Sequence, residues 1–340
     1  MPTRTTARPR GRVVMHELTS AALADNPLGD PALRTIPVYL PPGYDGGRAR
    51  YPVIYLLSGF TGTGRSFLNF QAYGETLPEK LDRLIADKKI GEMIVVMPDC
   101  YTKLGGSQYI DSPAIGRYET HLTEELIPDV DRAYRTLAEA SHRGVAGKSS
   151  GGYGAMVLGM RHPDLFGALA THSGDCAFEL CYQPDFAKAV SAIGRSGGLA
   201  KWFSWFESAI DKGNMGVTVM NVLAMAAAYS PNPRRKPLRA DLPFDIETAE
   251  LIPEVWARWL KHDPARIAKH HVAALKKLRL FYVDAGTRDE FFLHLGARIL
   301  VRELKALKIK HHHEEFDGGH FNISYRYDES FPRLWRALKP

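Results

Sequence analysis

The chain has 340 residues, of which 45% are hydrophobic and 24% are charged, as is ordinary for a globular protein. No apolar run approaches the roughly 20 residues that a bilayer-spanning helix needs, so no membrane association is expected. Lys and Arg (44) exceed Asp and Glu (38), which gives a net charge of +6. The basic residues are scattered and lack interleaved aromatic side chains, so nucleic-acid binding is not expected.

The location and the metal content follow from two further features. Met1 to Arg12 is arginine-rich but has no apolar stretch behind it, so we expect no secretory signal. The three cysteines, Cys100, Cys176 and Cys181, are an odd and sparse set without CxxC or zinc-type spacing. We therefore predict free thiols, a cytoplasmic protein, and neither a bound metal nor an organic cofactor.

Strands and helices alternate along most of the chain. The first two strands, over 13–18 and 35–40, are followed by strong turn residues and predict an antiparallel edge. Short apolar runs predict buried parallel strands over 51–57, 93–97, 145–146, 168–170, 280–283 and, more polar, 310–316. Helical periodicity lies between them, at 77–85, 118–134, 153–161 and 292–307. The pattern predicts an α/β fold with a mostly parallel twisted sheet and helices on both faces.

One connection is much longer than a crossover requires. About a hundred residues separate His172 from Leu280, and they contain four of the five tryptophans. We interpret residues 173–277 as a mainly helical cap inserted into a core formed by 1–172 and 278–340, and not as an independent domain.

The most informative motif follows the strand that ends near Ala146. Gly147-Lys148-Ser149-Ser150-Gly151 has the form GxSxG between a strand and a helix, which is typical of a nucleophile elbow with Ser149 as nucleophile. A structural glycine-rich turn is the plain alternative. A phosphate-binding GxxxxGK[ST] loop is another, but it requires glycine where His142 stands.

A nucleophilic serine needs an acid and a base, which follow it in that order in this kind of fold. The acid is expected after the strand 280–283, and we select Asp289 because it lies in the loop before the next helix. The alternatives are Asp284, which we place inside the strand, and Glu290, which suits the first turn of the helix.

The base is expected after the last strand. His320 in the glycine-rich loop 317–320 is the best candidate. The alternatives His311, His312 and His313 alternate along a strand and cannot all face one site, and His270 and His271 lie in a helix-like segment. These five are better explained as solvated or packed side chains than as a metal site.

Two backbone N–H groups should bind the oxyanion. One is that of Ser150, and the other is that of Phe60 in the loop after the first parallel strand. In the cap, Trp202 and Trp205 are candidates for the acyl pocket, although an equally good reading places them in the core of the lid.

The motifs together resemble the esterase family that includes S-formylglutathione hydrolases (esterase D), feruloyl and acetylxylan esterases, siderophore esterases and mycolyltransferases. The matching segments run in order through the sequence outside the cap: 38–45, 55–59, 96–99, 124–128 with 134–135, 147–155, 162–166, 286–291 and 318–320. The resemblance implies an α/β-hydrolase fold, the triad of Ser149, Asp289 and His320, and Phe60 and Ser150 as oxyanion donors. The long cap departs from the family pattern and leaves the substrate open.

The expected function is hydrolysis of a small carboxylic ester through an acyl-enzyme. An acyltransferase or an S-formylglutathione-type thioesterase with the same triad is an alternative. An inactive ligand-binding protein of the same fold is an alternative of another class. The sequence does not fix the oligomeric state, and a homo-oligomer is one of the open alternatives.

Overall fold

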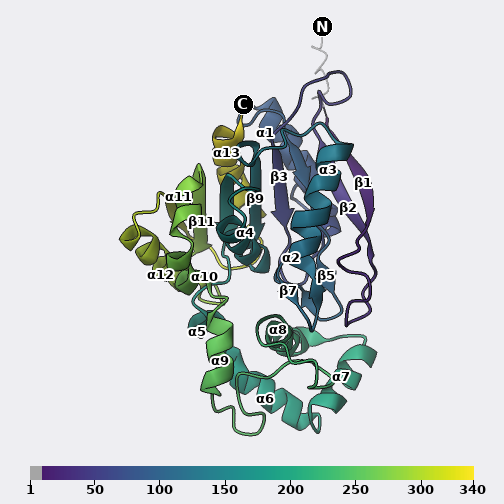
Figure 1. Ribbon diagram of the computed structural model, residues 1–340, viewed down its shortest axis with the longest axis vertical. Helices are drawn as coiled ribbons and strands as arrows, with labels where there is room; N and C mark the ends of the chain where they lie inside the picture. The colour runs from purple at the N-terminus through teal and green to yellow at the C-terminus, as the bar shows by residue number, and fades with distance from the viewer. Residues whose placement is uncertain (1–9) are drawn as a thin grey trace.

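The computed structural model describes residues 10–340 and is built around a twisted eight-stranded sheet (Figure 1). Residues 1–9, which include most of the arginine-rich start of the chain, lie outside the described residues. The sheet contains β1 (Arg12–Thr19), β2 (Leu33–Leu40), β3 (Val53–Leu57), β4 (Ile94–Val96), β9 (Arg143–Lys148), β10 (Ala168–His172), β11 (Leu280–Gly286) and β12 (His312–Phe316). Each of the eight strands predicted from the sequence is present.

The strand order is β1-β2-β4-β3-β9-β10-β11-β12. β1 and β2 pair antiparallel with each other, β2 pairs antiparallel with β4, and all other neighbours are parallel. The central strands β3, β4 and β10 are buried along their whole length, as their uninterrupted apolar sequences predict. The predicted fold class, an α/β-hydrolase fold, is confirmed.

Helices cover both faces of the sheet. One face carries α1 (Leu77–Ala86) and α13 (Tyr327–Leu338). The other carries α2 (Tyr118–Thr120), which continues through a π-helical turn (His121–Leu126) into α3 (Ile127–Ala133), together with α4 (Ser150–Arg161), α11 (Val272–Lys277) and α12 (Leu293–Ala306). α1 starts at a Thr76–Glu79 capping box with Pro78 in its first turn, as its sequence predicts.

Two short hairpins bring the loop after β4 under the cap. They are formed by β5 (Tyr101–Thr102) with β6 (Gly105–Gly106), and by β7 (Asp111–Ser112) with β8 (Gly116–Arg117). The Ser112 hydroxyl donates to the carbonyl of Ala227 in the cap at 2.6 Å, which fastens the second hairpin to the cap.

The residues from 173 to 277 are mainly helical, with a long non-helical stretch between Tyr229 and Pro253. They form α5 (Phe178–Cys181), α6 (Phe186–Arg195), α7 (Leu199–Ser208), α8 (Gly213–Tyr229), α9 (Pro253–Leu260), α10 (Pro264–Ile267) and α11. Helices α6 to α9 make a layer beyond the end of the sheet, at the bottom of Figure 1. α10 and α11 return to the core and pack against α4 and α12.

The buried side chains of the cap are continuous with those of the core. Tyr153 of α4 contacts Phe178 and Tyr229, with ring centroids 6.1 and 5.8 Å apart, and Tyr229 in turn contacts Trp259 at 5.5 Å. Aromatic contacts of this kind add to the free energy of burial. The cap therefore shares its hydrophobic core with the sheet and does not fold around a separate one.

Leu334 tests how far the fold depends on the C-terminal helix. Its side chain is fully buried between α13 and the sheet, beside Gly144 of β9. Leu334→Ala should lower the free energy of unfolding by about 2–5 kcal/mol through lost burial and a residual cavity. Arg336→Ala, at an exposed position on the same helix, should change it by less than about 0.5 kcal/mol. Urea denaturation followed by tryptophan fluorescence measures both, and equal effects would contradict the packing described here.

Candidate active site

Ser149 stands at the turn between β9 and α4 with backbone angles φ 58° and ψ −127°. Few residues other than glycine adopt a positive φ, and such a residue persists only where its surroundings hold it. Here the Ser149 N–H donates to the carbonyl of His172 at the end of β10, at 3.0 Å. The strained turn places the Ser149 side chain at the carboxyl end of the sheet, where ligands bind in open α/β sheets.

The two glycines of the motif are required by close contacts. A Cβ atom on Gly151 would lie 2.2 Å from the carbonyl oxygen of Leu57, and one on Gly147 would lie 2.4 Å from the carbonyl carbon of Gly151. Both distances are too short for any side chain. The glycines therefore let α4 begin directly against β3 and β9, which gives the elbow its sharpness.

The structure brings Ser149, His320 and Asp289 together. Nε2 of His320 lies 3.1 Å from the Ser149 hydroxyl oxygen, and Nδ1 of His320 lies 2.9 Å from a carboxylate oxygen of Asp289. His320 follows β12 and Asp289 follows β11, as the order of the chain predicts. The arrangement has the nucleophile, base and orienting acid within hydrogen-bonding reach of one another.

The Asp289 carboxylate is held in its charged form. Burial raises its pKa, but the hydrogen bond and the charge of His320 and the backbone N–H of Phe291 lower it further, so the pKa lies below its usual value. An ionised Asp289 keeps the proton of His320 on Nδ1 and leaves Nε2 free to accept the proton of Ser149.

The alternative acids and bases have other places. Asp284 lies within β11, as expected, and Glu290 accepts the backbone N–H of His320 at 2.6 Å. His311 contacts the carbonyl of Ile309, and His312 contacts Glu314. His270 and His271 lie at the end of a short 3-10 helix, Ala268–His270.

Two backbone N–H groups beside Ser149 are free to bind an oxyanion. Ser150 is the first residue of α4, where an N–H has no intrahelical acceptor. Phe60 lies in the turn after β3. Within residues 10–340 neither N–H donates a hydrogen bond, and both residues line the cavity that contains Ser149.

That cavity, named here the catalytic cavity, has a volume of about 230 Å³. Its walls come from the loop after β3, the elbow, the loop after β10, helix α8 and the loops of Asp289 and His320. The residues that line it besides the triad serine and histidine include Phe60, Asp175, Tyr182, Val217, Phe291 and Phe321. Of these side chains all but Asp175 are apolar or aromatic, which suits the organic part of an ester, and Lys148, Asp185, Thr218 and Asn221 add polar groups to the wall.

Trp202 and Trp205 do not line this cavity. Trp202 is buried in the core of the cap, stacked on Phe206 with ring centroids 5.2 Å apart. Trp205 is 42% exposed on the outer face of α7. Both side chains therefore belong to the lid and do not line the catalytic cavity.

The wall of the catalytic cavity contains two acids that the sequence motifs do not identify, Asp185, which pairs with Lys188, and the buried Asp175. One of its carboxylate oxygens accepts from the hydroxyls of Tyr182 (2.8 Å) and Ser150 (3.3 Å) and from the amide of Gln108 (3.3 Å). Burial raises the pKa of this carboxyl group above its ordinary value, although these hydrogen bonds oppose the rise. A buried acid that is this close to the elbow can accept a hydrogen bond from a substrate.

The three thiols and the metal-binding side chains offer no second chemistry here. Cys100, Cys176 and Cys181 are free and buried, and burial raises the pKa of each thiol above its ordinary value, which makes them poor nucleophiles. Among residues 10–340 no group of three or more His, Cys, Asp or Glu side chains is placed to hold a metal ion. In the same part of the chain, no helix combines the length and the apolar character needed to cross a bilayer.

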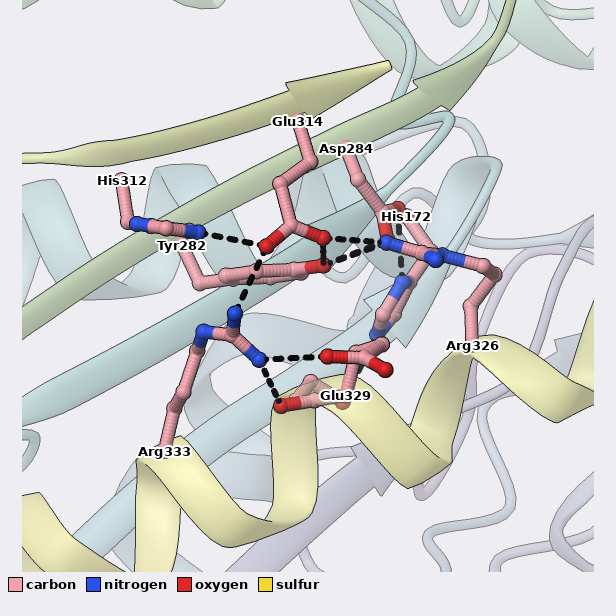
Figure 2. Close-up of polar contacts among 9 residues, drawn as sticks. His172, Tyr282, Asp284, His312, Glu314, Arg326, Glu329 and Arg333 are labelled. Carbon is pink, nitrogen blue, oxygen red and sulfur yellow. Dashed lines mark hydrogen bonds and ion pairs between the residues drawn. The ribbon is translucent and has the colours of Figure 1, made fainter. Parts of the chain in front are cut away.

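A network of buried charges lies on the other side of the elbow, between the ends of β10 to β12 and α13 (Figure 2). His172 contacts Asp284 through Nδ1 (2.7 Å) and the Ser330 hydroxyl through Nε2 (2.9 Å). Arg326 donates to Asp284 at 2.8 Å and to Glu314 at 2.6 Å, so it joins two strands of the sheet. His172 also supplies the carbonyl that holds Ser149, so the network fixes the elbow from behind.

Glu314 is the second centre of this network. It accepts from Arg326, Arg333 and His312, each at 2.6 Å. Burial raises its pKa, but these hydrogen bonds outweigh burial and lower the pKa from 4.5 to about 2. The carboxylate is therefore ionised throughout the neutral range and ties β12 to α13.

The comparison with known families decides the class. Residues 32–334 match the family model described as "Putative esterase". The chain belongs to this esterase family. The expectation drawn from the sequence motifs is confirmed.

Two curated relatives match part of the chain. An endo-1,4-beta-xylanase/feruloyl esterase of Xylanibacter ruminicola is 33% identical over 165 residues, which are 47% of this chain and 22% of the relative. An esterase of Mycobacterium tuberculosis is 34% identical over 142 residues, which are 40% of this chain and 28% of the relative. The esterase thus spans less than a third of the length of these curated relatives.

Solved structures with the same fold include two named esterases. A ferulic acid esterase superimposes with a TM-score of 0.64 at 21% identity and covers 96% of this chain and 99% of its own. An S-formylglutathione hydrolase from Agrobacterium tumefaciens gives a TM-score of 0.58 at 17% identity, covering 98% and 97%. At these identities the likeness concerns the fold.

Sequence reasoning found the elbow and its partners and missed several residues around them. Asp175 lies three residues after the end of β10, so the rule that sites lie after buried strands would have pointed to it. Phe291 and Phe321 flank the acid and the base. Val217 comes from the middle of an apolar cap helix, where nothing in the sequence distinguishes a cavity residue from a core residue.

The charge network makes a pH-dependent prediction. Because the pKa of Glu314 is lower in the folded chain than in the unfolded one, its contribution to stability is present above about pH 4.5 and is lost as the pH falls toward 2. Glu314→Gln should therefore lower the free energy of unfolding by about 2 kcal/mol at pH 7, and the difference from wild type should shrink between pH 5 and pH 3.

The measurement is urea denaturation as a function of pH. Glu329→Gln is the matched control, since Glu329 is more exposed and pairs with Arg333 alone. It should cost less than about 0.5 kcal/mol. A Glu314→Gln effect that is independent of pH would show that the carboxylate charge is not what stabilises this region.

Proposed function

We propose that this esterase is a serine carboxylic ester hydrolase that acts on a small ester through a covalent acyl-enzyme. The observation that carries the proposal is the pair of contacts of His320, at 3.1 Å to the Ser149 hydroxyl and 2.9 Å to the Asp289 carboxylate. The family match and the free N–H groups of Phe60 and Ser150 support the same reading.

In the first half-reaction the Ser149 hydroxyl attacks the ester carbonyl carbon, and its proton passes to Nε2 of His320. The oxyanion accepts hydrogen bonds from the N–H groups of Phe60 and Ser150, and each such bond is worth about 3 kcal/mol in the transition state. Asp289 stabilises the imidazolium. The tetrahedral intermediate then collapses, and the alcohol leaves with the proton from His320.

In the second half-reaction water attacks the acyl-enzyme. His320 takes a proton from the water, the same N–H groups bind the new oxyanion, and the acid leaves as Ser149 recovers its proton. Every catalytic group in these reaction steps belongs to the chain, and water is the co-reactant. The catalytic cavity, at about 230 Å³, suits a small acyl or aryl group beside Ser149.

Ser149→Ala tests the nucleophile. Hydrolysis of p-nitrophenyl acetate, butyrate and octanoate should fall by at least about a thousandfold, because the variant lacks the hydroxyl that forms the acyl-enzyme. Labelling by a fluorophosphonate should disappear with it. Ser141→Ala, at a serine outside the site, should keep both activities. Retained hydrolysis in Ser149→Ala would contradict the proposal.

Asp289→Asn tests the orienting acid against its rival. An amide at this position favours the wrong tautomer of His320, so kcat should fall by about a thousandfold to ten-thousandfold with little change in KM. Asp284→Asn should instead lower stability, because Asp284 serves the charge network, and should keep the kcat of the folded fraction. The opposite pattern in steady-state kinetics would make Asp284 the acid.

A further inference from the structure

Lys148 is a cation of the elbow that the proposed mechanism does not use. It directly precedes Ser149, and its ammonium lies over the ring of Phe321, 5.3 Å from the centroid. Phe321 directly follows His320. The charge of Lys148 is therefore held beside the loop of His320 by contact with an aromatic face.

Among the described residues, 10–340, no acid forms an ion pair with Lys148. Asp289 is bound to His320, and Glu290 accepts the backbone N–H of His320. Within residues 10–340 Lys148 forms neither an ion pair nor a hydrogen bond through its side chain. Its partial burial lowers the pKa of the ammonium below the ordinary value, while the charges of Asp289, Glu290 and Asp175 oppose that shift.

A second cavity, named here the side cavity, lies beside the catalytic cavity and has a volume of about 340 Å³. Gly59, Thr61 and Lys148 line both, so the loop after β3 is the wall between them. The rest of the side cavity is mixed, because apolar side chains such as Phe67 and Ile323 line it together with the polar groups of Ser66, Gln71 and Asn322. The acid and the base that border it are already paired, Glu75 with Arg83 (2.6 Å) and Lys80 with Asp328 (2.5 Å).

We propose that the side cavity, with Lys148 as counter-ion, binds a carboxylate carried by the ester substrate. The inference rests on the proposed function, since the substrate would extend from Ser149 across the loop of Gly59 and Thr61. In this proposal Lys148 is a specificity-determining residue. The enzyme would prefer half-esters of dicarboxylic acids, or esters whose leaving group is a hydroxy acid.

The charge balance favours a carboxylate. A partly buried ammonium without a partner is costly, and an anion that reaches it gains a charge-assisted hydrogen bond. One unpaired cation matches one negative charge. A phosphate monoester would bring close to two negative charges, and the second charge would face the carboxylate of Glu75 in the same cavity.

The experiment compares charged and neutral esters of the same shape in the wild type and in Lys148→Met. The acyl-side pair is 4-nitrophenyl hydrogen succinate and its methyl ester. The leaving-group pair is 4-acetoxybenzoate and its methyl ester. In at least one pair, the ratio of kcat/KM for the charged over the neutral ester should fall by about tenfold in Lys148→Met, the effect of losing one charged hydrogen bond.

Two variants serve as controls. Lys148→Arg keeps the charge and should keep most of the ratio. Lys305→Met removes the same charge from an exposed site on α12 and should leave the ratio within about twofold at 0.15 M salt, because long-range fields are screened there. A loss in Lys305→Met equal to that in Lys148→Met would assign the preference to net charge and overturn the proposal.

Binding to the inactive enzyme separates this inference from the proposed function. Calorimetric titration of Ser149→Ala with 4-nitrophenyl hydrogen succinate and with 4-acetoxybenzoate should give weaker binding of at least one, by about tenfold, once Lys148→Met is added. This readout needs no turnover, whereas absent hydrolysis of all neutral esters by the wild type would count against the proposed function alone. The role of Lys148 would be overturned if Lys148→Met left both the charged-to-neutral kcat/KM ratios and the binding affinities unchanged. It would also be overturned if kcat/KM fell equally for the charged and the neutral ester of each pair.

Discussion

The hydrogen bond from the Ser149 N–H to the His172 carbonyl joins the strained elbow to the rest of the molecule. Ser149 has a backbone conformation that costs free energy, so its neighbours must hold it there. On one side the glycines at 147 and 151 let β3 and α4 close on the turn. On the other, the side chain of His172 is fixed by Asp284 and Ser330, so the position of the nucleophile depends on a buried polar network that reaches α13.

That network explains why a polar strand lies at the edge of a hydrophobic sheet. β12 carries histidine and glutamate where its neighbours carry aliphatic residues, yet it is needed to place His320 in the loop that follows. Arg326 and Arg333 compensate the buried carboxylates of Asp284 and Glu314, and an arginine can reach two acids at once because its guanidinium has several donors in one plane. The charges therefore specify the register of β12 where apolar packing could not.

The chemistry of the site follows from local sequence more directly than its specificity does. The GxSxG turn and the loop of Asp289 each follow a buried strand, and the loop of His320 follows the polar edge strand β12. Such strand patterns are visible without a structure. The surroundings of these loops are not. Trp202 packs inside the lid, although a tryptophan side chain suits a substrate pocket equally well. Val217 lines the catalytic cavity, although it belongs to an apolar helix. In the sequence Lys148 fits the end of a GxxxxGK[ST] loop, and only the fold shows that its side chain lines two cavities and forms no ion pair within residues 10–340.

The cap lies within the crossover between two neighbouring parallel strands. β10 enters it, α11 packs beside α4 as an ordinary crossover helix, and β11 follows. The segment from α6 to α9 is thus an insertion that precedes α11, the helix that any crossover between these two strands requires. Because Ser149 precedes this segment and Asp289 and His320 follow it, the lid can be lengthened, shortened or rewritten without moving any of the three, so the surroundings of the site can diverge while these residues keep their places in the fold.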